Sequence, residues 1–144
     1  MSRNTTYTST LRSGPKGVGV YAGSVQLVAE ISFDPILAST DTGVKLPSGA
    51  IVTDVVTDGG ATGGISPTVD IGTSTDPDGF VNEGDADLAR NSNLAKGTLG
   101  VLAYTALAAD TSIFAGVGAS AATGGTVTAK IFYYRQDDTS GLNH

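Results

Sequence analysis

The chain has 144 residues, the usual size of one domain, with 20 glycines, no cysteine and one histidine, His144. Without cysteine there is no disulfide, thiolate nucleophile or cysteine-based zinc site, and a lone histidine at the last position argues against imidazole catalysis or metal binding. The net charge of −6 disfavours nucleic acid as the main partner, no run of about 18 apolar residues predicts a membrane span, and the polar N-terminus does not resemble a secretory signal.

Charge is unevenly distributed along the chain. Residues 1–29 carry Arg3, Arg12 and Lys16 and no acidic residue, whereas residues 30–144 carry five basic and fourteen acidic side chains. The sequence therefore predicts a basic arm in front of an acidic body. The arm is either disordered with incidental charge, or it becomes ordered on an acidic partner surface.

The first half of the chain alternates between strand-like and turn-like segments. Residues 1–15 lack periodicity and predict an extended N-terminal arm, and residues 16–22 alternate weakly. Residues 25–33 alternate apolar and polar side chains without a break, which predicts a strand that Asp34-Pro35 ends. We expect a loop over 35–43 and a turn over 46–49.

A β-branched strand is predicted over 50–57 and a short one over 68–72, which we expect to form a hairpin across a flexible glycine-rich connector at 58–64. Residues 73–87 form an acidic loop in which Phe80 and Val81 are expected to insert into the core. Asp85 could cap a short helix running to Leu94, with Gly97 ending it.

The last third of the chain predicts strands over 98–107, 111–118 and 126–135, the first of which could also be helical. In the final strand Val127, Ala129, Ile131 and Tyr133 should face one way, and Phe132 and Tyr134 should form an exposed stripe on the other. Residues 137–144 are expected to be a loose tail.

Strands at spacings of about ten residues with glycine-rich turns predict an all-β fold, a β-sandwich of jelly-roll type over residues 16–136. Such a sandwich has exposed edges, and we expect a partner copy to cover an edge or a face. The exposed stripe of Phe132 and Tyr134 favours such a subunit interface, although these aromatics could instead pack under a loop.

No catalytic site is apparent, so we expect a protein that is not an enzyme and needs no cofactor or metal. The acidic loop fails the EF-hand pattern, because Phe80 and Val81 stand where a ligand and the invariant glycine should be; a solvated loop and a calcium site remain the alternatives. The chain has no tryptophan to stack sugars in a glycosidase cleft, and the paired glycines at 59–60 and 63–64 lack the Gly-Lys-Ser/Thr of a phosphate loop.

Three stretches resemble a known group of proteins. The residues Leu46–Val55 (LPSGAIVTDV), Gly63–Val81 (GGISPTVDIGTSTDPDGFV) and Gly124–Tyr134 (GGTVTAKIFYY) are similar to segments of small β-rich virion proteins of tailed phages, including capsid decoration (cement) proteins. The resemblance covers about residues 44–135 and leaves the N-terminal arm outside.

The resemblance implies a jelly roll that sits as a homotrimer on the outer surface of the virion capsid, bound to the major capsid protein and made in the host cytoplasm. On this hypothesis Arg3, Arg12 and Lys16 dock the arm on the shell, and Phe132 and Tyr134, or residues 101–118, form the subunit contact. No nucleic acid or membrane partner is expected. The alternatives are a receptor-binding or fibre-associated virion module and a tail-tube or connector subunit.

Overall fold

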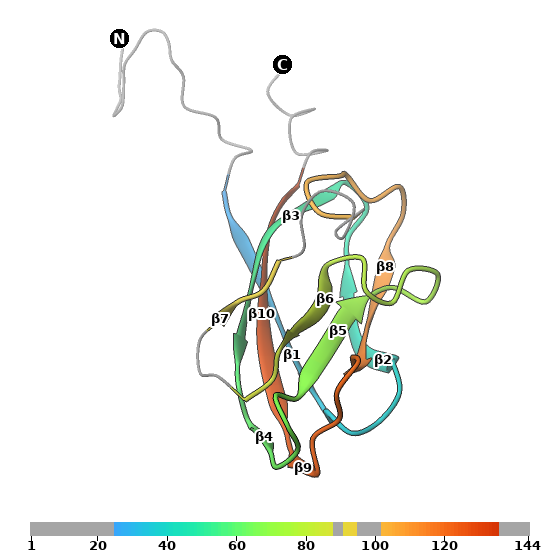
Figure 1. Cartoon of the computed structure of the whole chain (residues 1–144). Helices are drawn as coiled ribbons and strands as arrows, with labels where there is room; N and C mark the ends of the chain where they lie inside the picture. The colour runs from blue at the N-terminus through green and yellow to red at the C-terminus, as the bar shows by residue number, and fades with distance from the viewer. Residues whose placement is uncertain (1–24, 88–90, 95–101, 136–144) are drawn as a thin grey trace, which may run out of the picture.

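The computed structural model describes residues 25–87, 91–94 and 102–135. Within these residues the regular elements are strands, which form two four-stranded antiparallel sheets and a small two-stranded pair at one end (Figure 1). The predicted all-β sandwich is confirmed. The described part of the chain holds no helix with the length and apolar character that crossing a bilayer requires. The predicted arm at 1–15, the weakly alternating residues 16–22 and the tail at 137–144 lie outside the described residues, as do residues 88–90 of the predicted helix and Gly97.

The two large sheets and the small pair have the following strands. The first sheet has the order β1 (Leu27–Phe33), β10 (Val127–Arg135), β3 (Ala50–Asp58), β7 (Asn91–Ser92). The second has the order β2 (Thr40–Leu46), β8 (Thr111–Val117), β5 (Thr68–Gly72), β6 (Val81–Asp85). The small pair consists of β4 (Ala61–Thr62) and β9 (Gly124–Gly125).

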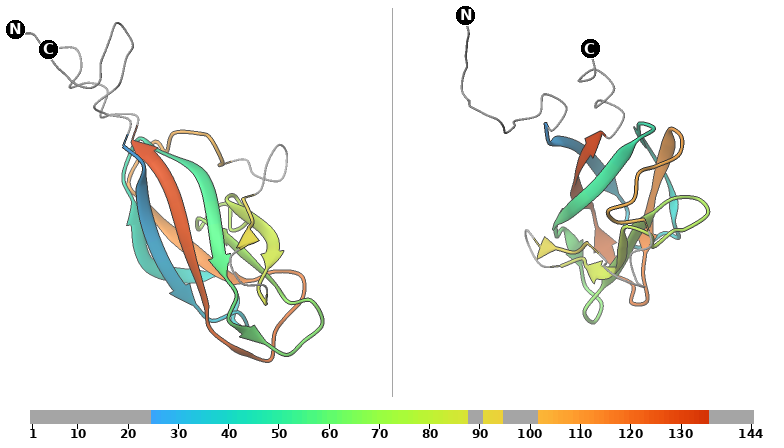
Figure 2. Two further views of the ribbon diagram at one scale, coloured as in Figure 1. Left: turned by 90° about the vertical axis from the view of Figure 1, so that its left-hand side faces the viewer. Right: turned by 90° about the horizontal axis from the view of Figure 1, so that it is seen from above.

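The chain crosses from one sheet to the other at almost every connection. Among the strands of the two large sheets, β5 and β6 are the one consecutive pair that is also hydrogen-bonded. The long partners β1 and β10 come from opposite ends of the described chain and lie side by side in antiparallel register (Figure 2). This alternation, with the first and last strands adjacent in one sheet, is the jelly-roll topology.

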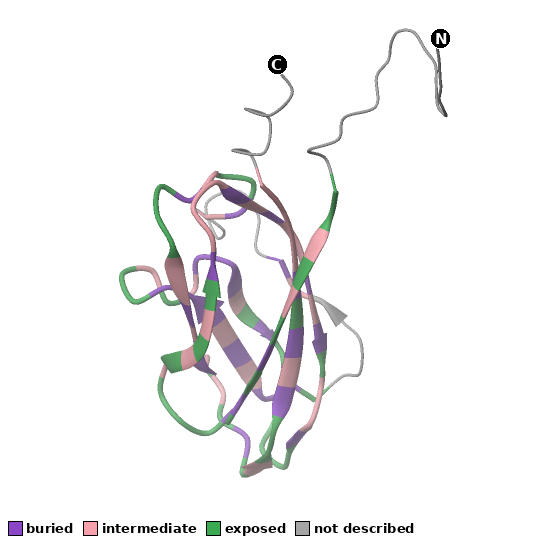
Figure 3. Ribbon diagram, turned by 180° about the vertical axis from the view of Figure 1, so that it is seen from behind, coloured by how far each residue is buried: buried purple, intermediate pink, exposed green. Residues whose placement is uncertain are grey.

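The core lies between the inward faces of the two sheets. Buried and exposed residues alternate along the strands (Figure 3). In β10, Val127, Ala129 and Ile131 are buried while Lys130 is exposed, as the sequence predicts. The largest fully buried side chain is Phe80, whose N–H donates to the carbonyl of Ile71 at 2.9 Å. The expectation that Phe80 and Val81 enter the core is confirmed.

Two strands of the second sheet were not predicted. β2 lies where a loop and a turn are expected, and β6 lies in the predicted acidic loop. β2 contains Gly43 in the left-handed region with a φ of 82°, and its register with β8 is interrupted between Asp41 and Lys45. Each strand carries few inward apolar side chains, so its alternation is weak.

Three other local predictions are wrong. Asp85 ends β6 and caps no helix; Leu94 is buried beside β3, where the Asn93 N–H donates to the Val55 carbonyl at 2.9 Å. The described part of 98–107 forms turns along β3, with the Tyr104 N–H donating to the Val52 carbonyl at 2.9 Å. The hairpin of β3 with β5 does not form, because these strands lie in different sheets.

The end of the sandwich that holds β4 and β9 is closed by contact between the β4–β5 connection and the β8–β10 connection. The Ser120 hydroxyl donates to the Ile65 carbonyl at 2.6 Å, and the Thr123 N–H donates to the Thr62 carbonyl at 2.8 Å. Gly64 has a φ of 80°, and a Cβ on it would lie 2.4 Å from the carbonyl oxygen of Ala121. The connector at 58–64 is therefore held in place by the β8–β10 connection.

A pair of glycine substitutions measures this contact. Gly43→Ala should cost about 1 kcal/mol, because its φ of 82° disfavours a side chain but no atom lies within 4 Å of the new Cβ. Gly64→Ala has the same backbone conformation plus a clash, so we expect a loss above about 2 kcal/mol in the free energy of unfolding, measured by urea denaturation. Equal losses would contradict the tight packing of the two connections.

Candidate interaction surfaces

The outer face of the first sheet carries the residues that the sequence singled out for subunit contact. Phe132 lies on β10 between Val28 of β1 and Asp54 of β3. Tyr134, opposite Ile51, follows it beyond a bulge in the pairing with β3. Phe132 and Tyr134 are half-buried by their own chain, so the stripe is less exposed than expected. It remains the aromatic part of this face.

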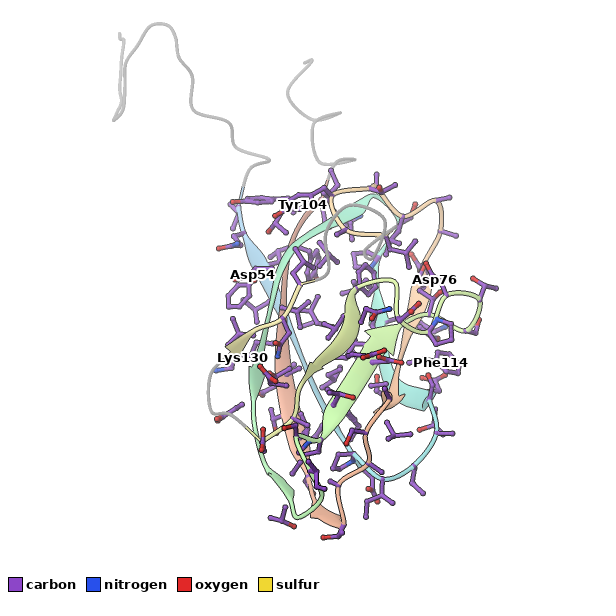
Figure 4. All side chains as sticks on the ribbon, viewed as in Figure 1. Asp54, Asp76, Tyr104, Phe114 and Lys130 are labelled. Carbon is purple, nitrogen blue, oxygen red and sulfur yellow. The ribbon has the colours of Figure 1, made fainter. Side chains whose placement is uncertain are left out.

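Below Phe132 the same face becomes polar and slightly hollowed. A depression of about 250 Å³ is lined by Glu30, Val56, Asp58, Thr128 and Lys130. Glu30 and Lys130 are directly opposite each other on neighbouring strands. Asp54 and Lys130 project from this side of the molecule, whereas Phe114, a half-buried aromatic residue on the outer face of β8, lies on the opposite side (Figure 4). The depression brings together two carboxylates, one ammonium group and the Thr128 hydroxyl.

The acidic loop and β6 form the most charged part of the second sheet. Asp76 projects from the β5–β6 connection (Figure 4), the Asn82 amide donates to Asp78, and the Glu83 N–H donates to Asp70 at 2.8 Å. Among the residues that the structure describes, no three histidine, cysteine or acidic side chains are grouped so that they could hold a metal ion. Glu83, Asp85 and Asp87 are exposed, so this surface is acidic.

Two carboxyl groups of this surface have shifted pKa values. Burial raises the pKa of Asp70 above its ordinary value of 3.8; the Glu83 N–H opposes the shift, and the charges of Asp78 and Glu83 add to it. Burial and a hydrogen bond with Asp78 raise the pKa of Asp76. A raised pKa means that the folded state binds the proton more tightly than the unfolded state does.

Charge is also unevenly placed between the described and the remaining residues. The described residues hold all but two of the fourteen acidic side chains, the exceptions being Asp137 and Asp138. They hold three of the eight basic ones, namely Lys45, Lys130 and Arg135. Arg3, Arg12 and Lys16, the predicted docking residues, lie outside the described residues. The acidic body predicted from the sequence is thus the sandwich itself.

Large exposed apolar side chains gather at the two ends of the sandwich. At the end where β1 begins and β10 finishes, Val25 is 63% exposed and Tyr104 is 56% exposed (Figures 1 and 4). At the other end, Leu37 in the β1–β2 connection is 55% exposed and Ile65 in the β4–β5 connection is 87% exposed. Sequence reasoning missed Ile65, which lies between the predicted connector at 58–64 and the predicted strand at 68–72, and Tyr104, which lies in the predicted strand at 98–107.

Comparison with known proteins adds a fold relationship. No family model matches the sequence, and no curated protein matches it. A chain of the cyanophage Pam1 capsid asymmetric unit is similar in structure, with a TM-score of 0.53, 22% sequence identity, and coverage of 89% of this chain and 97% of that chain. A chain of the acid-stable capsid of the Helicobacter pylori bacteriophage KHP30 has a TM-score of 0.47, 18% identity, and coverage of 78% and 90%. The likeness to the Pam1 capsid chain shows that the two share a fold over nearly their whole lengths.

The shifted pKa of Asp70 gives a test of stability against pH. The contribution of Asp70 to stability falls as the pH rises from below 3.8 through its raised pKa, because the folded state resists ionisation of this carboxyl. Asp70→Asn can still accept the Glu83 N–H, so it should be more stable than wild type at pH 7, and this gain should vanish below pH 3.8.

Urea unfolding at several pH values measures the difference. Asp41→Asn is the matched control, because exposed Asp41 accepts the Gly43 N–H at the same 2.8 Å distance. The control should leave stability nearly unchanged. A gain for Asp70→Asn that persists in acid would contradict the assignment.

Proposed function

We propose that the chain is a structural protein of a phage virion, which binds the outer surface of the capsid as a homotrimer and stabilises the shell. The observation that carries the proposal is the shared fold with a chain of the Pam1 capsid asymmetric unit, over 89% of this chain and 97% of that one. The resemblance of three sequence segments to virion proteins of tailed phages supports the same role. The major capsid protein is the expected partner.

The exposed surfaces support a role in binding. Exposed apolar residues at both ends of the sandwich provide area for contact with other proteins. In a trimer three identical weak contacts act together, so each can be worth only a few kcal/mol.

The subunit contact is assigned to the half-buried aromatic pair on β10. Aromatic residues carry much of the binding energy in protein interfaces, and Phe132 lies beside exposed Val28 on the same face. Exposed Val25, at the beginning of the described chain, and Tyr104 extend the apolar area at the end of the sandwich where β10 finishes. We assign the basic arm to the shell, where its three positive charges meet an acidic capsid surface.

Removing the aromatic pair tests the trimer. The double variant Phe132→Ser with Tyr134→Ser should convert trimers to monomers, measured by size-exclusion chromatography with light scattering at several concentrations. Phe114→Ser is the matched control, because Phe114 is also half-buried on an outer sheet face but on the other side of the molecule. A monomeric wild type, or equal dissociation by Phe114→Ser, would show that the contact is assigned wrongly.

Neutralising the arm tests attachment to the shell. With Arg3, Arg12 and Lys16 all changed to Gln, binding to heads assembled from the major capsid protein of the same genome should weaken by roughly threefold to 150-fold, since three exposed ion pairs contribute roughly 0.2–1 kcal/mol each. Binding of the variant should also depend less on salt. Lys45→Gln, a change at an exposed basic residue of β2, serves as the control in the cosedimentation assay. Unchanged binding of the triple variant would refute the role of the arm.

A further inference from the structure

The most exposed large apolar side chain among the described residues is at the end of the sandwich opposite the beginning of β1. Ile65 is 87% exposed, compared with 63% for Val25, the next highest. It lies in the β4–β5 connection, at the end that β4 and β9 close (Figure 1). The side chain stays almost fully exposed in the folded protein, so its hydrophobic surface is available to a partner.

The main chain around Ile65 is fixed by its own fold. Gly63, Gly64 and Ser66 have φ values of 71°, 80° and 45°, which place Ile65 in a tight left-handed bend. The Ile65 carbonyl accepts the Ser120 hydroxyl at 2.6 Å, and the Thr68 N–H donates to the Ser120 carbonyl at 2.8 Å. A side chain carried on such a frame loses little conformational freedom when it binds.

The two packed connections that hold Ile65 contain no charged side chain. Residues 62–66 and 119–126, which form these connections, consist only of glycine, alanine, serine, threonine and Ile65 itself. This composition is unusual for a sandwich that holds twelve of the fourteen acidic residues of the chain. Depletion of charged residues is typical of the centre of a protein interface.

The chemistry of this end selects one kind of partner. Nucleic acid requires basic side chains, and a membrane surface requires basic or aromatic companions; residues 62–66 and 119–126 contain neither. The depression on the first sheet would offer a second copy a poor site, because three of its five lining residues, Glu30, Asp58 and Lys130, are charged. The uncharged composition around Ile65 favours a pocket with apolar walls on a different protein.

We propose that Ile65 inserts into an apolar pocket on a subunit of the capsid shell; this assignment rests on the proposed function. The basic arm joins the sandwich at Val25, at the opposite end from Ile65 (Figure 1). Between these two ends lies the nine-residue strand β10, which is roughly 30 Å long. On this proposal one copy binds the shell in two ways, by electrostatic attraction of the basic arm and by burial of the apolar Ile65 side chain.

The test is cosedimentation with heads assembled from the major capsid protein of the same genome. Ile65→Ser should weaken binding at least about tenfold, because burying an isoleucine contributes roughly 1.5–3 kcal/mol. Its thermal unfolding should match wild type, since the side chain is exposed. Leu37→Ser is the matched control, an exposed aliphatic residue at the same end, and should stay within about twofold of wild type. Ile65→Leu should retain binding.

The possible failures are distinguishable. If wild type binds heads and Ile65→Ser binds equally well, the pocket assignment is wrong while the proposed function stands. If Leu37→Ser is weakened as much as Ile65→Ser, binding depends on general surface hydrophobicity and the assignment is also wrong. If Ile65→Ser dissociates the trimer without heads present, Ile65 contacts a second copy instead. If wild type fails to bind heads at all, the proposed function fails, and the pocket with it.

Discussion

Contact between the inward faces of the two four-stranded sheets is the interaction on which this molecule depends. Without it, neither sheet could bury the alternating valines and isoleucines of its strands. Phe80 shows how far this contact reaches: it inserts from a connection that is otherwise acidic, and its N–H bonds to Ile71 in the neighbouring strand. The same burial holds the charged β5–β6 connection close to the sheet and so positions the acidic surface.

The exposed apolar residues stand out because the core is otherwise so complete. Isoleucines 31, 71, 113 and 131 are all 2% exposed or less, so the fold has no shortage of places to bury such a side chain. Ile65 lies between residues with left-handed φ values, and Tyr104 itself has a φ of 61° in the turns beside β3. Exposed apolar side chains are therefore displayed at both ends of the sandwich.

Strands with strong alternation could be predicted from the sequence, and their partners could not. β1, β3, β5, β8 and β10 follow apolar periodicity, because each places branched side chains toward the core. β2 and β6 were missed, since Gly43 and the acidic residues of β6 obscure the same period. The hairpin of β3 with β5 was wrong for a different reason: in a jelly roll consecutive strands mostly belong to opposite sheets, and no local pattern encodes that crossing.

The candidate surfaces, too, could be predicted only in part from the sequence. The outward direction of Phe132 follows from strand alternation and was predicted, but its half-burial depends on neighbouring strands that only the fold brings together. The glycine-rich segment at 58–64 indicates a flexible connector when taken alone. It becomes a fixed platform only through Ser120 and Thr123, which are more than fifty residues away along the chain.

The backbone character of the contact between the β4–β5 and β8–β10 connections has an evolutionary consequence. Glycine 64 meets a carbonyl of the other connection, and the carbonyl of residue 65 accepts the hydrogen bond, so the side chain at position 65 contributes nothing to the frame that displays it. Such a position can change freely without loss of stability. A single codon change there could adapt the protein to a different binding surface while the scaffold beneath it stays the same.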